Sequence, residues 1–300
     1  MSSRTVAVTG ATGLIGRALI AALLERGDRV VALVRSPPRK ELPERVEQRA
    51  WDAAFKVADL HGVDAVVHLA GSPVATRRWS AARKRQLEFS RVLGTRAVVR
   101  GIREYPGVRV LVSASGIDYY GDTGDEEVTE ESDHGEGFLP DMAVHWEQEA
   151  EAARALGTRV VLLRTGLVLA RGEGALARME PVFRAGLGGR LGNGEQWVSW
   201  IHLADEVGLI LHALDREEVE GPLVAASPQP VRNREFGRAL GSALGRPAFL
   251  WAPGPLLRLA LGEMATLVLS SHRARPAKAL ETGYRFRFPD LESALADLYA

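Results

Sequence analysis

The sequence predicts an α/β protein with a doubly wound parallel sheet and a smaller C-terminal lobe. Three observations predict this fold. Short runs rich in Val and Leu alternate with helical patterns over the first 170 residues, glycines are dense where the first run ends, and the composition changes after residue 170. Alternation of this kind is typical of βαβ units, in which helices cover both faces of a parallel sheet.

The strand candidates are short apolar runs, as expected of strands that a parallel sheet buries on both faces. They lie at residues 5–9, 29–33, 65–69, 109–113 and 159–163. Helical patterns separate them at residues 15–26, 81–104 and 141–156. Later helices are expected at residues 205–214, 233–244, 255–261 and 291–298. They follow a glycine-dense segment, residues 172–194, which is typical of loops that cover a site.

The composition excludes several classes of protein. The chain has 300 residues, with 38 Lys and Arg against 38 Asp and Glu, and no cysteine. A zero net charge gives no electrostatic reason to expect nucleic acid or an anionic membrane as a partner, and the lack of cysteine excludes disulfides and a cysteine nucleophile. No apolar stretch has the length of a signal peptide or a membrane span. We therefore expect a cytoplasmic monomer or homodimer without metal, nucleic-acid or membrane partners.

A glycine-rich loop joins the first strand to the first helix. Gly10 would permit a tight turn, Gly13 would let the backbone approach a pyrophosphate, and Gly16 would let the helix pack close to the sheet. The alternative is a tight turn that holds no ligand. The pattern favours a Rossmann-type dinucleotide-binding domain over residues 1–170. Residues 171–300 are then a smaller substrate or lid lobe that also returns elements to the main sheet. The loop residues predicted to bind the cofactor are Gly10, Thr12, Gly13, Leu14, Ile15 and Gly16.

The end of the second strand predicts which dinucleotide is bound. An acidic residue at this place would bind the ribose 2′-hydroxyl of NAD, but the sequence has Arg35 and Ser36. A guanidinium offers paired hydrogen bonds to a 2′-phosphate. We therefore expect NADP(H) as the cofactor, bound in part by these two residues. A solvated surface arginine is the alternative.

The order of motifs along nearly the whole chain resembles the extended short-chain dehydrogenase/reductase superfamily. It is most similar to the atypical branch described as epimerase-family or nucleoside-diphosphate-sugar epimerase-like proteins. The motifs that carry the resemblance are the loop from Thr9 to Gly16, Val67 to Gly71, Arg77-Arg78-Trp79, Ser90 to Thr95, Ser113-Ala114-Ser115, Tyr119 to Asp122, His145-Trp146-Glu147, Arg164-Thr165-Gly166, Gly186 to Gly189 and Trp200-Ile201-His202.

The resemblance implies further cofactor contacts at the ends of the strands, where ligands of such sheets bind. Leu69, Ala70 and Gly71 would pass under the adenosine, and Arg91, on the long helix, would face the cofactor. Ser113 and Ser115 would lie near the nicotinamide, and Arg164 and Gly166 would close the nicotinamide end.

Catalytic members of the superfamily use a Tyr and a Lys four residues later, on the helix before the strand at 159–163. The Lys lowers the pKa of the Tyr, so that the phenol can exchange a proton with substrate. Counting back from this strand places the two positions at Met142 and Trp146, which have no such chemistry. The remaining candidates for catalysis are Tyr120, Ser115 and His202.

Two functions remain open from the sequence. The first is an NADP(H)-dependent oxidoreductase or epimerase-like enzyme that acts on an unknown small molecule with a replaced proton donor. The second is a non-catalytic NADP(H)-binding sensor or partner-binding protein. The glycine-rich second half favours the first, and the missing Tyr and Lys favour the second.

Overall fold

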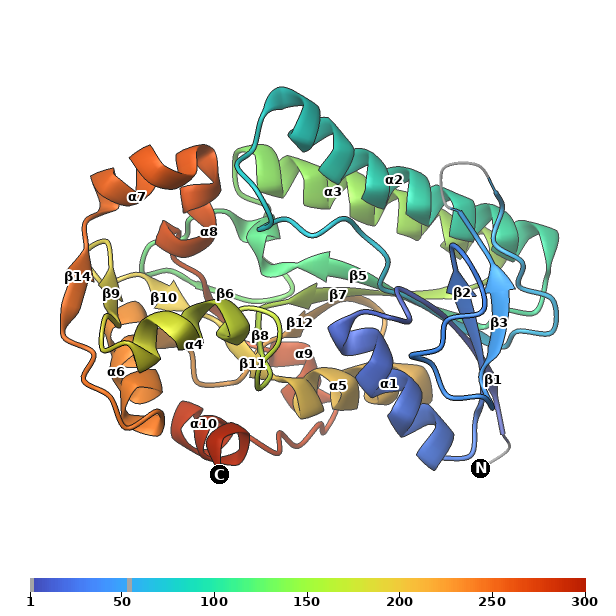
Figure 1. The fold of residues 1–300 in the computed structure, drawn as a ribbon. Helices are drawn as coiled ribbons and strands as arrows, with labels where there is room; N and C mark the ends of the chain where they lie inside the picture. Colours follow the sequence, from blue (N-terminus) through green and yellow to red (C-terminus); the bar gives the residue numbers. More distant parts are fainter. Residues whose placement is uncertain (1–2, 53–55) are drawn as a thin grey trace.

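The computed structural model describes residues 3–52 and 56–300, and a seven-stranded sheet forms its centre (Figure 1). All neighbouring strands of this sheet pair in parallel. The strand order reverses between β1 and β4, so a ligand crevice is expected beyond the carboxyl ends of these two strands. In spatial order the strands are β12 (Gly221–Ala225), β7 (Arg159–Thr165), β5 (Val110–Gly116), β4 (Ala65–His68), β1 (Thr5–Thr9), β2 (Arg29–Val34) and β3 (Glu47–Ala50).

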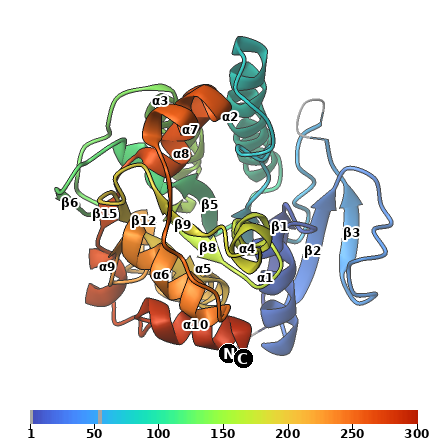
Figure 2. The ribbon, with the colours of Figure 1, turned by 60° about the vertical axis from the view of Figure 1, so that its left-hand side comes forward.

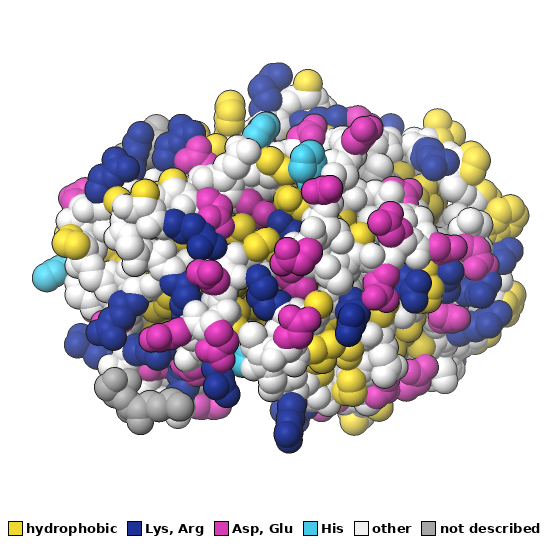
Figure 3. Space-filling model, turned by 180° about the vertical axis from the view of Figure 1, so that it is seen from behind, with side chains coloured by type: hydrophobic (Ala, Val, Ile, Leu, Met, Phe, Trp, Pro, Cys, Tyr) yellow, Lys and Arg dark blue, Asp and Glu magenta, His cyan; other side chains and the backbone are white. Residues whose placement is uncertain are grey.

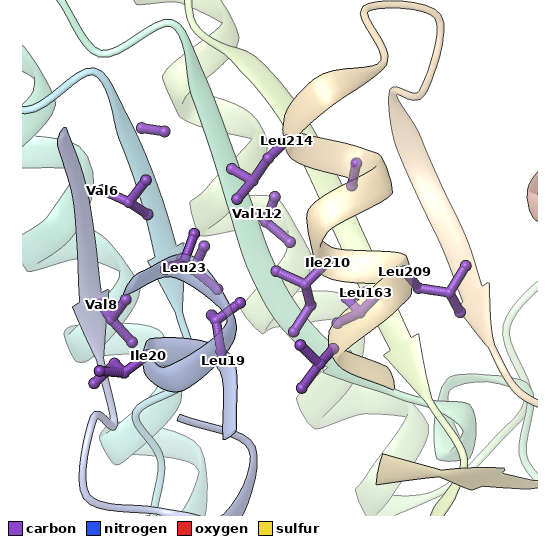
Figure 4. Packing of buried hydrophobic residues seen from close by; sticks show 14 of the residues in the cluster. Val6, Val8, Leu19, Ile20, Leu23, Val112, Leu163, Leu209, Ile210 and Leu214 are labelled. Carbon is purple, nitrogen blue, oxygen red and sulfur yellow. The ribbon is translucent and has the colours of Figure 1, made fainter. Parts of the chain in front are cut away.

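Helices cover both faces of the sheet. In Figure 1, α2 (Ala81–Glu104) and α3 (Phe138–Glu151) lie above it, and α1 (Leu14–Glu25) and α5 (Leu203–Asp215) lie below it. Alternate residues of each strand pack against the helices on opposite faces of the sheet, because successive strand side chains point to opposite faces. Figure 4 shows Val6 and Val8 of β1 beside the leucines and isoleucine of α1, in the core that α5 completes. Ala7, between them, belongs to the core under α2.

A third core holds the C-terminal lobe together. Trp200, Phe236, Leu240 and Leu295 are all buried in it. Burial of large apolar side chains stabilises such a lobe by about 1.5–3 kcal/mol each. The elements of the lobe are β8 (Leu167–Leu169), α4 (Leu176–Arg184), β9 (Gly189–Leu191), β10 (Trp197–Val198), β11 (Trp200–His202), β13 (Val231–Arg232), α6 (Asn233–Ala243), β14 (Leu250–Ala252) and α10 (Leu291–Tyr299).

The segment after β14 returns from the lobe to the nucleotide-binding half. Figure 2 shows its helices α7 and α8 on the same side of the molecule as α2 and α3. Glu263 forms an ion pair with Lys84 of α2, and Leu267 packs on the apolar cluster around Leu87. The segment then pairs with an early strand, so that it closes one side of the molecule. Its elements are α7 (Gly254–Leu261), η3 (Gly262–Ala265), α8 (Thr266–Leu269), β15 (Arg273–Ala274), which pairs with β6 (Glu127–Val128), and α9 (Ala277–Glu281).

The predicted fold class is confirmed, and each of the five predicted strands is present. Two further strands of the central sheet, β3 and β12, were not predicted from the sequence. The edge strand β3 has the polar sequence Glu-Gln-Arg-Ala, which carries no apolar run to detect. The helix predicted at 141–156 begins earlier, at Phe138, and its last turn is the 3-10 helix η2 (Ala152–Leu156), which ends at left-handed Gly157.

The surface agrees with the balanced charge of the chain. Figure 3 shows acidic and basic side chains interspersed over the face seen from behind. In the part of the chain that the structure describes, no helix has the length and apolar character needed to cross a membrane.

Candidate cofactor and active site

The loop between β1 and α1 is shaped by its glycines. Gly10 has φ of +65°, and a Cβ there would lie 2.8 Å from the backbone of Leu69. A Cβ on Gly16 would lie 2.3 Å from the carbonyl oxygen of Gly10. Both glycines are therefore required by the fold itself, because the turn and the first helix pass so close to other backbone.

Gly13 differs from the other two glycines. A Cβ on it would meet only the Gly10 carbonyl oxygen, at 3.2 Å, and its φ of −78° suits any residue. It is the N-cap of α1, where no side chain caps the helix and no acidic residue lies in the first turn. The first N–H groups of α1 are thus left to an outside acceptor, as a helix N-terminus that binds phosphate requires.

Arg17, which sequence reasoning did not single out, ties this loop to the lobe. Its Nη1 donates to the carbonyl oxygen of Thr12 at 2.7 Å. Its Nη2 forms an ion pair with Glu173, in the glycine-dense segment that follows β8. One side chain therefore contacts both the phosphate loop and the C-terminal lobe.

A buried chain of hydrogen bonds fixes the adjoining end of β4. Thr9 Oγ1 accepts the N–H groups of Leu69 and Ala70, each at 3.1 Å, and lies 2.7 Å from His68 Nδ1. The Thr9 hydroxyl therefore donates to Nδ1, and Nε2–H donates to Thr95 at 3.1 Å. Burial lowers the pKa of His68 to about 4, so the ring is neutral and structural. This chain places Leu69 and Ala70 beside Gly10. Their contact with the adenosine, which the resemblance implies, stays a prediction.

The two residues expected at the 2′-phosphate lie at the surface. Arg35 and Ser36 are exposed directly after β2. Within residues 3–52 and 56–300, neither side chain makes a hydrogen bond or an ion pair. The Arg35 guanidinium thus retains all its donors for a ligand at the end of β2.

Arg91 lies at the end of β4 with its positive charge buried. Nη1 donates to the carbonyl oxygens of Ser72 and Leu87, and the guanidinium packs 5.0 Å from the ring centre of Trp146. A Cβ on Gly71 would lie 3.5 Å from it, and its buried Nε has no hydrogen-bond partner. Burial lowers the pKa of Arg91 to about 10, and Asp118 opposes that shift. The arrangement suits an anionic group at this edge.

The ends of β5 and β7 carry a buried ion pair that sequence reasoning missed. Arg164 of β7 donates from Nε and Nη2 to the two carboxylate oxygens of Glu147, at 2.9 and 2.8 Å. Ser115 Oγ donates to the same carboxylate at 2.6 Å. Arg164 Nη1 donates to the Tyr120 hydroxyl at 2.9 Å. Only the motif His145-Trp146-Glu147 marked Glu147, and nothing local indicated its partner.

This network changes the interpretation of the catalytic candidates. Burial raises the pKa of Tyr120 to about 12, which makes its phenol a weaker acid near neutral pH. The Ser115 hydroxyl and all three Arg164 nitrogens are engaged within the network. The raised pKa therefore argues against Tyr120 as a proton donor near neutral pH, and the ion pair turns Arg164 toward Glu147.

Helix α3 offers no replacement in any register, because none of its residues is Tyr or Lys. Met142 is buried in an apolar cluster with Leu87 and Leu139, and buried Trp146 lies against Arg91. The positions that would carry the usual pair are thus apolar or aromatic, and Glu147 is the charged residue on the buried face of this helix.

The remaining predicted residues have structural contacts. Ser113 is fully buried inside β5. A Cβ on Gly166 would lie 2.6 Å from the Ser199 carbonyl oxygen, so glycine permits the close approach of β11.

His202 lies in the C-terminal lobe. It caps α5 by accepting from the N–H of Ala204, and its ring packs 4.0 Å from that of Phe288. Its Nε2 lies 3.4 Å from Asp297, and burial lowers the pKa of the ring. These contacts belong to α5 and the C-terminal segment, and the structure does not join His202 to the Ser115–Tyr120 network.

A buried carboxyl group lies behind the same strand ends. Glu206 of α5 accepts from Thr165 Oγ1 at 2.8 Å through one oxygen, and its Oε2 has no hydrogen-bond partner. Burial raises the pKa of Glu206 to about 8. Among the described residues, no group of three or more His, Asp or Glu side chains could hold a metal ion.

Comparison with known proteins relates these features to a family. Residues 6–224 match the model of the NAD dependent epimerase/dehydratase family, and residues 252–298 match a domain of unknown function, DUF1731. An epimerase family protein of Mycobacterium tuberculosis is 40% identical over 299 residues, which cover 98% of this chain and 97% of that protein.

Two solved structures share the fold over nearly the whole chain. Human epimerase family protein SDR39U1, crystallised with NADPH, is 34% identical with a TM-score of 0.88, covering 98% of this chain and 99% of that one. A nucleoside-diphosphate sugar epimerase of Corynebacterium glutamicum is 32% identical with a TM-score of 0.83, covering 99% of this chain and 58% of that one.

Proposed function

The chain belongs to the NAD dependent epimerase/dehydratase family, and from this membership we propose that it is an NADP(H)-dependent oxidoreductase or epimerase-like enzyme for a small molecule. The observation that carries the proposal is the uncapped start of α1, at the same carboxyl edge of the sheet as the Arg35 guanidinium, which has no partner among residues 3–52 and 56–300. Binding of NADPH in the related human protein supports the choice of cofactor. A cytoplasmic location and a monomeric or homodimeric state belong to the same proposal.

The proposed cofactor contacts follow the edge of the sheet. The backbone of the loop at residues 10–16 and the first turn of α1 would hold the pyrophosphate. Arg35 and Ser36 would bind the 2′-phosphate, and Gly71 and Arg91 would lie further along the same edge. Bound NADP(H) would supply or accept a hydride, and the protein would orient the ring and exclude water.

We assign supporting roles to the three residues first considered for catalysis. Ser115 and Tyr120 would hold Glu147 and Arg164 in place beneath the nicotinamide end, because their hydroxyl groups are bound there. His202 would fix the start of α5 in the lobe. On this proposal the usual Tyr and Lys are replaced by residues elsewhere in the molecule.

The alternative is a non-catalytic NADP(H)-binding sensor or partner-binding protein, which the absence of Tyr and Lys from α3 favours. Two measurements separate the possibilities. Quenching of Trp fluorescence by NADPH and NADH measures binding, and absorbance at 340 nm measures turnover with small carbonyl compounds and nucleotide sugars. We expect tight NADPH binding with measurable turnover. Binding without turnover would support the sensor, and no binding of NADPH would refute both.

A further inference from the structure

Asp118 and His272 face each other across the two halves of the molecule. Asp118 lies on η1 (Ile117–Tyr120), the turn that begins directly after β5. His272 belongs to the segment between α8 and β15, which returns from the C-terminal lobe. The distance from His272 Nε2 to Asp118 Oδ1 is 4.0 Å. The side chains are 11% and 32% exposed, so the ring is nearly enclosed while the carboxylate still meets solvent.

The backbone around His272 is held on both sides. Its N–H donates to the Trp197 carbonyl oxygen at 3.0 Å, and its carbonyl oxygen accepts from Ser199 Oγ at 2.7 Å. The preceding N–H, of Ser271, donates to Asp122 at 3.1 Å. These bonds fix the backbone from which the imidazole extends and do not engage the ring itself.

The two functional groups are unengaged, in contrast to the network around Glu147. Within the described ranges, neither the His272 ring nor the Asp118 carboxylate makes a hydrogen bond, and none of their polar atoms is sealed from solvent. His145 and Glu88, an ordinary surface pair, lie 2.8 Å apart. At 4.0 Å the two groups are too far apart for a direct hydrogen bond, and one oxygen atom can lie within about 2.8 Å of both.

The pair lies at the reactive end of the proposed cofactor site. A Cβ on Gly116, the last residue of β5, would be 3.8 Å from Asp118 Oδ2. The Asp118 charge also acts on Arg91, which contacts Gly71 at the end of β4. Both strand ends belong to the edge where the nicotinamide would bind.

We propose that Asp118 and His272 exchange the substrate proton in place of the absent Tyr and Lys. The inference rests on the proposed function, and it makes these the catalytic residues of that reaction. In the reducing direction, bound NADPH would supply a hydride to the carbonyl carbon. The C=O π pair then moves to the oxygen, which takes a proton from the protonated pair. Asp118, at the solvent side, restores that proton from water.

The reverse direction uses the same groups. The deprotonated pair accepts the proton of a substrate hydroxyl, and the oxidised cofactor, when bound, would take up the hydride that the carbon loses. The substrate class is therefore a secondary alcohol or the corresponding carbonyl compound, with its oxygen between the carboxylate and the imidazole. Reduction slows as pH rises through the pKa of the pair, and oxidation accelerates.

Charged groups around the pair set that pKa. Burial lowers the pKa of His272, and the carboxylates of Asp118 and Asp122 oppose the shift. Arg91 faces Asp118 from α2. The nicotinamide ring adds a further charge, because it is positive in NADP+ and neutral in NADPH.

The first test uses this difference and needs no substrate. We would titrate the His272 Cε1–H signal by NMR with saturating NADPH and with saturating NADP+, and assign it by its loss in His272→Gln. We expect the pKa of His272 to be about one unit lower with NADP+. Glu88→Gln, which changes a surface carboxylate beside a histidine, should leave this titration unchanged. Equal titrations with both cofactors would overturn the inference while the proposed function stands.

The second test measures turnover with the most active compound of the carbonyl panel. Asp118→Asn and His272→Gln should each lower kcat about 10²- to 10⁴-fold and leave NADPH affinity unchanged. Full turnover in both variants would overturn the inference. Failure of the wild-type protein to bind NADPH would refute the proposed function, and the inference with it, and Trp quenching identifies that outcome separately.

Discussion

Two neighbouring regions of the sheet edge are built in different ways. At the ends of β1 and β2, backbone conformation defines the site: Gly10 and Gly16 fit because no side chain could, and Arg35 is exposed. At the ends of β5 and β7, buried side chains define it, and the central pair is Glu147 with Arg164. The first region is therefore formed by residues that are adjacent in the sequence. The second needs residues that only folding brings together.

We expect the largest loss of stability at the ends of β5 and β7, where buried side chains define the site. Glu147→Ala leaves the Arg164 guanidinium, whose side chain is 3% exposed, without its carboxylate. An uncompensated buried charge of this kind costs about 3–5 kcal/mol of unfolding free energy, which urea denaturation measures. Glu149→Ala on the same helix removes an exposed pair with Arg96 and should cost at most about 1 kcal/mol. Equal losses in the two variants would show that burial adds nothing to the contribution of the Glu147–Arg164 pair, and that buried side chains do not define the second region.

The next effect is a pH dependence from Glu206. Burial raises its pKa from 4.5 to about 8, so the folded protein binds a proton that the unfolded chain releases. The contribution of protonated Glu206 to the free energy of unfolding is fully present below about pH 4.5 and is lost as pH rises through about 8. Glu206→Gln should therefore unfold at a higher temperature than wild type at pH 8, with a smaller difference at pH 5. A difference in melting temperature that does not change with pH would show that Glu206 is ionised in the folded state.

At the ends of β1 and β2, a substitution of Gly13 should abolish cofactor binding while the protein still folds. Gly13→Val fills the space that the pyrophosphate needs, while its own backbone can carry a side chain. NADPH affinity should fall at least about a hundredfold, or about 2.7 kcal/mol, with an unchanged circular dichroism spectrum. Gly16→Val is the contrasting variant, because its Cβ would meet the Gly10 carbonyl and destabilise the fold. Unchanged NADPH affinity in Gly13→Val would mean that the loop does not hold phosphate.

The smallest effect concerns the choice between cofactors. Arg35→Ala should weaken NADPH binding about ten- to a hundredfold, because a charge-assisted hydrogen bond to the 2′-phosphate is lost. NADH has no such phosphate, so its affinity should not change. Competition titrations with both cofactors measure the ratio. A parallel loss for NADH would assign Arg35 to the shape of the turn rather than to recognition.

The same comparison explains what sequence reasoning could predict. The loop from Gly10 to Gly16 was predictable because its meaning depends on adjacent residues and their backbone geometry. Five strands of the sheet were predictable for the same reason, whereas the polar edge strand β3 and the short buried strand β12 were not. Glu147 with Arg164, and Asp118 with His272, depend on long-range contacts that no spacing encodes. Tyr120 and His202 have side chains that could act in catalysis. In the folded protein Tyr120 accepts a hydrogen bond from Arg164, and His202 caps α5.

Arg17 couples two binding events thermodynamically, since it contacts both the phosphate loop at Thr12 and the lobe at Glu173. A pyrophosphate bound at this loop would compete for the same guanidinium, and any change in the Glu173 contact would alter how firmly the lobe is held. Linkage requires the effect to be reciprocal, so a ligand that stabilises the lobe changes dinucleotide affinity by the same factor.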